Sequence, residues 1–161
     1  MSLEPLAYAD GEVALTGWLA LPKGSPRAAV AVFPTFMNTS PGVEAKALAL
    51  AEAGCIALVA DFYGPDAPHD AASAFAAMER LRGDPRAMRA RLHASLTALA
   101  EAAPGLPQIA IGFCLGGMAV LELARDGAGF DHCAGQPRRL VPGVGAGLVR
   151  FRQRDAAARM L

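Results

Sequence analysis

Short apolar runs alternate with longer stretches of helical pattern along most of the chain. The runs Ala28–Phe33 and Cys55–Ala60 are apolar throughout, which is typical of parallel strands buried on both faces. A third, shorter run covers Ile109–Ile111. Helices are predicted between and after these runs, over residues 42–53, 70–81, 84–103 and 116–125. This alternation predicts an α/β fold with a mainly parallel sheet, right-handed crossovers and helices on both faces.

Local signals mark the ends of several elements. Asp10-Gly11 is a turn signal, and it predicts a hairpin whose second strand, 12–20, lies at the edge of the sheet. Asp84-Pro85 combines a helix N-cap with proline at the first helical position. In the helix at 70–81 we expect Phe75 and Met78 to face the core.

The most informative segment is Gly112-Phe113-Cys114-Leu115-Gly116-Gly117. It follows an apolar strand and precedes the helical stretch at 116–125. A strand, a Gly-x-nucleophile-x-Gly turn and a helix form a nucleophile elbow, here with cysteine in place of the commoner serine. Glycine is needed on either side because the turn is tight and its backbone passes close to neighbouring segments.

This geometry would place the Cys114 sulfur at the carboxyl edge of the sheet and at a helix N-terminus. Free N–H groups and the positive end of the helix dipole stabilise a thiolate there. The N–H of Leu115 would point at the oxyanion of a tetrahedral intermediate. The alternative is that Cys114 is an ordinary small buried residue, since free cysteines are often buried.

Several motifs in order give the chain a resemblance to the dienelactone hydrolase family, a branch of the α/β-hydrolases with a cysteine nucleophile. The elbow at 112–117 is the central match. The others resemble the family's opening hairpin, its first central strand, and its next helix and strand: Tyr8–Gly11 with Leu15–Ala20, Ala28–Pro34, and Leu48–Gly54 with Ala57–Gly64.

The resemblance implies hydrolysis of small-molecule esters or lactones by a Cys-His-Asp triad, with no metal and no cofactor. It implies that the loop after the strand at 28–33 supplies a second oxyanion N–H, which maps to Phe36. The family carries a glutamate, paired with the resting cysteine, at the position of Thr35. The threonine departs from that pattern, so the family's way of activating the thiol is not expected to apply unchanged.

A thiol nucleophile also needs a base and an orienting carboxylate, which follow the nucleophile in α/β-hydrolases. His132 follows the elbow helix too closely for another strand to form before it. His93 lies in a helical stretch and is expected to be solvated. His69 follows the strand at 55–60 in a loop at the functional edge, where a surface position is the default and a base role the alternative.

The same loop contains Asp61-Phe62-Tyr63-Gly64, directly after a strand. One interpretation is that these residues shape the substrate pocket. The other, which we favour, is that the carboxylate and the phenol anchor the loop.

The character of the chain changes near residue 131. Residues 1–130 contain 9 Lys and Arg against 13 Asp and Glu, whereas residues 131–161 contain 6 Arg against 2 Asp. The sequence therefore predicts an N-terminal part of a hydrolase domain over 1–130 and an Arg- and Gly-rich tail over 131–161, not native hydrolase sequence. A changed reading frame near Asp131 and truncation would explain this, and a divergent natural C-terminus is the alternative.

Without triad acid and base, we expect this chain to have impaired activity. The alternative is a non-catalytic hydrolase remnant that acts as an interaction module or is an unstable fragment. An incomplete sheet would expose an edge through which copies could associate. A thiol-transfer protein is a weaker option because no resolving cysteine lies near Cys114.

Composition bounds the remaining possibilities. Hydrophobic residues make up 53% of the 161 residues, yet no apolar run is long enough for a membrane span. The start of the chain resembles no signal peptide, so a cytoplasmic location is expected. The three cysteines form neither a metal motif nor a disulfide framework, and Cys55 is expected in the core. The tail arginines lack interleaved aromatic residues, so no nucleic-acid partner is predicted.

Overall fold

A computed structural model describes residues 2–127, 132–136 and 147–149, the last two segments by their backbone alone. The strands of these residues are β1 (Leu3–Asp10), β2 (Val13–Ala20), β3 (Ala28–Phe33), β4 (Cys55–Val59), β5 (Gln108–Phe113), β6 (His132–Gln136) and β7 (Gly147–Val149). The helices are α1 (Pro41–Glu52), α2 (Ala71–Gly83), α3 (Pro85–Ala102) and α4 (Leu115–Asp126), with a 3-10 turn, η1, at Gly64–Asp66.

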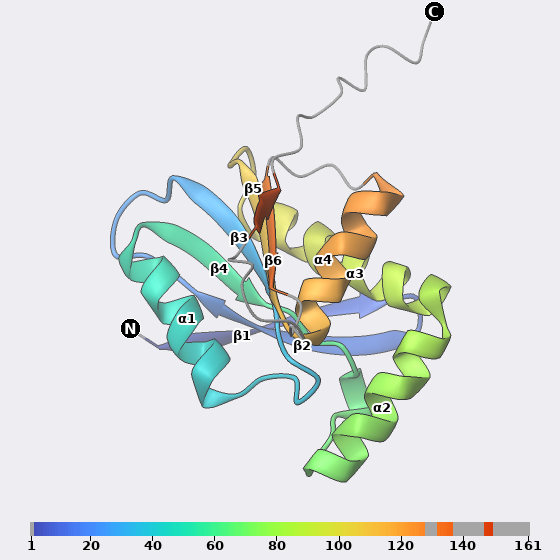
Figure 1. Cartoon of the computed structure of the whole chain (residues 1–161). Coiled ribbons are helices and arrows are strands. Elements are labelled where there is room, and N and C mark those ends of the chain that lie inside the picture. Colours follow the sequence, from blue (N-terminus) through green and yellow to red (C-terminus); the bar gives the residue numbers. More distant parts are fainter. Residues whose placement is uncertain (1, 128–131, 137–146, 150–161) are drawn as a thin grey trace, which may run out of the picture.

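The described strands form one sheet in the order β1-β2-β4-β3-β5-β6-β7 (Figure 1). The four central strands, β4, β3, β5 and β6, run parallel, while β1, β2 and β7 pair antiparallel. This is the predicted α/β arrangement. β2 lies between β1 and β4, so the prediction that residues 12–20 form an edge strand is wrong, and β1 takes that place.

Each face of the sheet carries its own apolar core. Successive β3 side chains point to opposite faces because the side-chain period of a strand is two. Ala29, Ala31 and Phe33 pack with residues of α2, α3 and α4. Val30 and Val32 pack with Val43, Ala47 and Ala51 of α1. The helices therefore cover both faces, as the sequence predicts.

The helix boundaries follow their caps. Asp84 accepts a hydrogen bond from the Ala87 N–H at 3.0 Å, and Pro85 is the first residue of α3, as expected from the sequence. Asp70 and Ser73 form a reciprocal capping box at the start of α2. The Asp10-Gly11 signal also holds, because β1 and β2 form a tight hairpin in which Gly11 has a φ of +58°.

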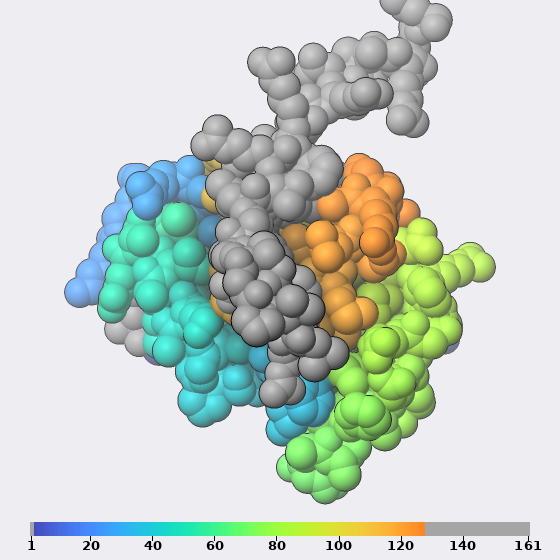
Figure 2. Space-filling model, in the orientation of Figure 1, coloured from blue at the N-terminus to red at the C-terminus, as the bar shows by residue number. Residues whose placement is uncertain are grey.

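One core prediction is wrong: the Phe75 side chain is 56% exposed. The buried residues of α2 are Ala74, Ala77 and Leu81, one helical stripe, and Met78 packs partly against the core. α2 extends past the body of the molecule at its lower corner in both views (Figures 1 and 2). The helical period allows Phe75 to face inward, but the face of α2 that packs on the core is the one that carries Ala74, Ala77 and Leu81.

Strand β6 is not predicted from the sequence. It begins at His132 and pairs parallel with β5 in register Ile109 to His132, so His132 is itself the first residue of a strand. Most of the segment expected to be a tail, residues 137–146 and 150–161, lies outside the described residues.

Candidate active site: a nucleophile turn beside an oxyanion loop

Cys114 lies at the bend between β5 and α4. Its backbone has a φ of 57° and a ψ of −110°, and it directly precedes the first residue of α4. A positive φ is costly for a residue with a side chain and persists only where the surrounding structure imposes it. The residue is half-buried and its thiol is free. Cys114 is therefore neither sealed in the core nor inside a helix, whereas Cys55 is buried in the core as predicted.

Two glycines allow this bend. A Cβ on Gly112 would lie 2.0 Å from the Gly116 carbonyl oxygen. A Cβ on Gly116 would lie 2.1 Å from the Phe33 carbonyl oxygen, at the end of β3. Real Cβ atoms do not approach backbone this closely, so both positions exclude any side chain. The two glycines therefore allow the tight turn, as the sequence predicts.

The turn is joined to the loop that follows β3. The Gly116 N–H donates to the Pro34 carbonyl at 2.9 Å. The next residues, Thr35 to Asn38, form a tight turn in which the Asn38 N–H donates to the Thr35 carbonyl at 3.0 Å. The loop carrying Phe36 is thus fixed directly beside the nucleophile turn. Thr35 and Phe36, singled out from the sequence, lie in the same short loop.

Thr35 does not extend a carboxylate-like group toward the thiol. Its hydroxyl accepts a hydrogen bond from the Met37 N–H at 3.3 Å and so stabilises its own loop. Leu115 is the first residue of α4. Of the N–H groups that follow, that of Gly116 donates to the Pro34 carbonyl and that of Gly117 to the Cys114 carbonyl at 3.0 Å. This leaves the Leu115 N–H as the candidate oxyanion donor.

The buried Asp61 carboxylate holds the loop after β4 and, through it, the loop after β3. Asp61 is 6% exposed and accepts hydrogen bonds from four N–H groups, those of Thr16, Tyr63 and Gly64 and the side-chain amide of Asn38, at 2.9–3.0 Å. The Asn38 side-chain oxygen in turn accepts from the Phe62 N–H at 3.0 Å. The loop after β3 and the loop after β4 are therefore joined by hydrogen bonds at the carboxyl edge of the sheet.

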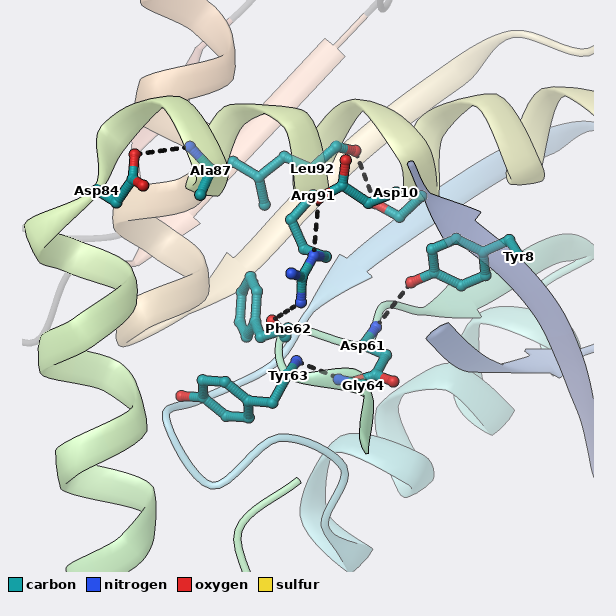
Figure 3. Close-up of polar contacts among 11 residues, drawn as sticks. Tyr8, Asp10, Asp61, Phe62, Tyr63, Gly64, Asp84, Ala87, Arg91 and Leu92 are labelled. Carbon is teal, nitrogen blue, oxygen red and sulfur yellow. Dashed lines mark hydrogen bonds and ion pairs between the residues drawn. The ribbon is translucent and has the colours of Figure 1, made fainter. Parts of the chain in front are cut away.

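Two further side chains hold the same segment from outside (Figure 3). The Tyr8 hydroxyl, from β1, accepts a hydrogen bond from the Asp61 N–H at 2.9 Å. The Arg91 guanidinium, from α3, donates to the Phe62 carbonyl at 2.7 Å and pairs with Asp10 at 3.1 Å. The loop-anchoring interpretation of Asp61 and Tyr63 is confirmed. Sequence reasoning missed Asn38, a buried polar residue whose side chain bonds to Asp61 and Phe62 and whose φ of 61° is one that asparagine tolerates better than most residues.

Tyr63 touches the loop after β3 directly. Its hydroxyl donates to the Phe36 carbonyl at 2.9 Å, and the residue is 6% exposed. Burial, and to a lesser extent the charge of a Cys114 thiolate, raise the pKa of Tyr63 to about 12. The phenol is therefore a neutral hydrogen-bond donor at physiological pH, and it lies near the nucleophile.

The histidines with described side chains have other partners. His69 is 85% exposed and lies 3.9 Å from Asp70, so its default surface interpretation holds. His93 is half-exposed and bonds to Asp126 at 2.8 Å rather than being merely solvated. Within the described residues, no cluster of three or more His, Cys, Asp or Glu side chains could hold a metal ion. None of the helices in that part of the chain is both long and apolar enough to span a membrane.

Comparison with known proteins gives the family. The dienelactone hydrolase family model matches residues 15–135. The crystal structure of a dienelactone hydrolase-like promiscuous phosphotriesterase, P91, from metagenomic libraries superposes with a TM-score of 0.72 at 36% identity, covering 79% of this chain and 55% of P91. A protein titled m3DLH gives a TM-score of 0.71 at 35% identity, with the same coverages. A search of curated proteins found no match.

More distant structures share the fold. Dienelactone hydrolase from Anabaena variabilis superposes with a TM-score of 0.60 at 23% identity, covering 77% of this chain and 57% of that one. The chain thus spans little more than half the length of these three structures. The family match ends a few residues beyond the boundary expected at residue 130, and the division of the chain there stays a prediction.

Proposed function

The chain belongs to the dienelactone hydrolase family, and we propose that it carries the nucleophile half of a hydrolase acting on carboxylic esters or lactones. The Cys114 thiolate attacks the carbonyl carbon and forms a C–S bond. The carbonyl electrons move to oxygen, and the resulting oxyanion accepts hydrogen bonds from the Leu115 and Phe36 N–H groups. Collapse of this intermediate breaks the acyl C–O bond, the released alkoxide takes a proton from water, and a thioester remains on Cys114.

The observation that carries this proposal is the strained, half-buried Cys114 at the start of α4, bonded through Gly116 to the loop bearing Phe36. Strain at a non-glycine residue persists where the surrounding packing imposes it, and it clusters at active sites. Oriented amides favour charge on oxygen in the transition state.

Full turnover needs an acid and a base, and the two histidines with described side chains lie beside Asp70 and Asp126 instead. The proposal is therefore that this chain undergoes acylation but deacylates slowly or not at all. The alternative function is a non-catalytic remnant that acts as an interaction module, in which case the Cys114 thiol would show no special reactivity.

A burst experiment tests the proposal. The chain is mixed with p-nitrophenyl acetate, and release of p-nitrophenolate is followed by stopped flow. We expect a burst of about one equivalent per chain, an acetyl adduct on Cys114 by mass spectrometry, and little turnover afterwards. Cys55→Ala should keep the burst and Cys114→Ala should abolish it. A Cys114 that acylates no faster than a free thiol of the same pKa would contradict the proposal.

The similarity to P91 suggests a second substrate class for the same test. Attack on a phosphotriester also develops negative charge on an oxygen, which the same amides could accept. A p-nitrophenyl phosphotriester can replace the acetate in the burst assay. A burst that again requires Cys114 would support this extension.

A further inference from the structure

The peptide group between Phe36 and Met37 is held from both of its ends. On one side the Tyr63 hydroxyl donates to the Phe36 carbonyl at 2.9 Å. On the other, the Met37 N–H donates to the Thr35 hydroxyl at 3.3 Å. The two bonds hold the Phe36–Met37 peptide in one orientation. The Phe36 N–H belongs to the preceding peptide but shares the Phe36 Cα, so a shift of the backbone at Phe36 would also change the direction of this N–H.

Tyr63 is itself rigidly placed. Its backbone N–H donates to Asp61 at 2.9 Å, and its ring packs against the Phe62 ring with centroids 6.0 Å apart. Asp61 also bonds to Asn38, the residue that ends the turn. Asp61 therefore bonds both to the Tyr63 backbone and to Asn38, at one end of the loop after β3, while the Tyr63 hydroxyl bonds to Phe36 within that loop.

We propose that Tyr63 is a positioning residue for the oxyanion site, acting through the Phe36 carbonyl to keep the Phe36 N–H directed at the carbonyl oxygen of a substrate bound at Cys114. This inference rests on the proposed function. It assigns Tyr63 no proton transfer and no contact with the substrate. Burial keeps the phenol protonated, so the bond to Phe36 persists across the neutral pH range.

Two reactions of one thiol separate this role from a merely structural one. Acylation by p-nitrophenyl acetate builds an oxyanion that the Phe36 N–H stabilises. Alkylation by iodoacetamide displaces iodide at a saturated carbon and builds no oxyanion. Both reactions need the thiolate and access to the sulfur. Their rate ratio therefore reports the oxyanion site alone.

The test compares this ratio in the wild-type chain, in Tyr63→Phe and in Tyr8→Phe. Tyr63→Phe keeps the ring and removes the bond to Phe36. Tyr8→Phe removes the hydroxyl of a partly buried tyrosine, which bonds to the Asp61 N–H and not to the loop after β3. We expect Tyr63→Phe to lower the acylation rate about 10-fold at an unchanged alkylation rate, which is less than the loss from deleting an oxyanion donor. Tyr8→Phe should leave the ratio unchanged.

Each outcome decides the matter. An unchanged ratio in Tyr63→Phe, or an equal slowing of both reactions, overturns the positioning role while the wild-type burst still supports the hydrolase function. Absence of wild-type acylation overturns both. If circular dichroism shows that Tyr63→Phe does not fold, the ratio is measured in Thr35→Val, which frees the same peptide from its other end, and an unchanged ratio there overturns the inference.

Discussion

The two loops that form the site meet at one edge of the sheet, but different forces hold them. The turn after β5 is fixed by close contact: the Gly112 and Gly116 backbones leave no room for a Cβ. The loop after β3 is fixed by hydrogen bonds: its Asn38 side chain bonds to Asp61 and Phe62, and its Phe36 carbonyl accepts from Tyr63. A turn fixed by close contact cannot accept even one added atom without moving, whereas a loop held by several hydrogen bonds can lose one bond and keep its fold.

The way in which each loop is held fits the chemistry that we propose for it. The nucleophile needs one strained backbone conformation, which rigid packing imposes. An oxyanion donor needs its N–H aimed within a narrow range, which several directional bonds provide. Added side-chain atoms should therefore destabilise the turn after β5 most, whereas the loss of hydrogen-bond partners should destabilise the loop after β3 most.

The largest effect is expected from Gly116→Ala. Its Cβ would overlap the Phe33 carbonyl, so the free energy of unfolding should fall by about 3 kcal/mol or more. Gly42 is the matched control, because it is also the second residue of its helix and has open space around it. Gly42→Ala should be neutral or stabilising by up to about 1 kcal/mol. Urea denaturation measures both, and equal effects would refute the steric account.

Asp61→Asn comes next. The change replaces an acceptor with a donor inside a cluster of N–H groups, which should cost about 2–3 kcal/mol. Asp66→Asn, on the exposed η1 turn, should stay within about 0.5 kcal/mol of wild type. Thermal unfolding compares the two. If Asp61→Asn unfolded at the same temperature as Asp66→Asn, the loop after β3 would be held by something other than the Asp61 carboxylate.

The hydrogen-bonded loop should also be the more sensitive to alkali. Burial raises the pKa of Tyr63 from 10.0 to about 12, so the folded chain holds this proton more tightly than the unfolded chain. Its contribution is fully present below pH 10 and is lost as the pH rises toward 12. After allowance for solvent screening, the effect is on the order of 1 kcal/mol.

Urea denaturation at pH 7 and pH 11 measures this loss, and Tyr63→Phe should show a smaller one. Some pH dependence should remain in that variant, because burial also raises the pKa of Tyr8. If wild type and Tyr63→Phe lost the same stability between pH 7 and pH 11, the Tyr63 phenol would not have different pKa values in the folded and unfolded chains.

The smallest expected effect concerns Cys114 itself. At a φ of 57°, alanine is strained and glycine is not. Cys114→Gly should therefore equal or exceed Cys114→Ala in stability, by up to about 1 kcal/mol, the reverse of the usual order near a helix start. Calorimetry on the two variants measures the difference. A clearly more stable alanine variant would mean that the turn can relax and is not held by packing.

The elements that the sequence predicted well are those with a local cause. Asp84-Pro85 starts α3 because a cap and a proline act within one turn. β3 and β4 follow from continuous apolar runs. Phe75 was mispredicted because periodicity specifies a face of a helix but not whether another layer covers it. β6 was missed because its pairing with β5, rather than its own pattern, makes it a strand.

By itself, the sequence determined the alternating α/β fold, the glycine-flanked turn and the cysteine within it, because these depend on short-range sterics and on periodicity. Only the tertiary structure decided that Asp61 and Asn38 join two loops and that Tyr63 bonds to the Phe36 carbonyl. Those partners lie 23 and 27 positions apart in the chain. No local pattern encodes such a pairing, which arises when parallel strands bring their carboxyl ends to one edge.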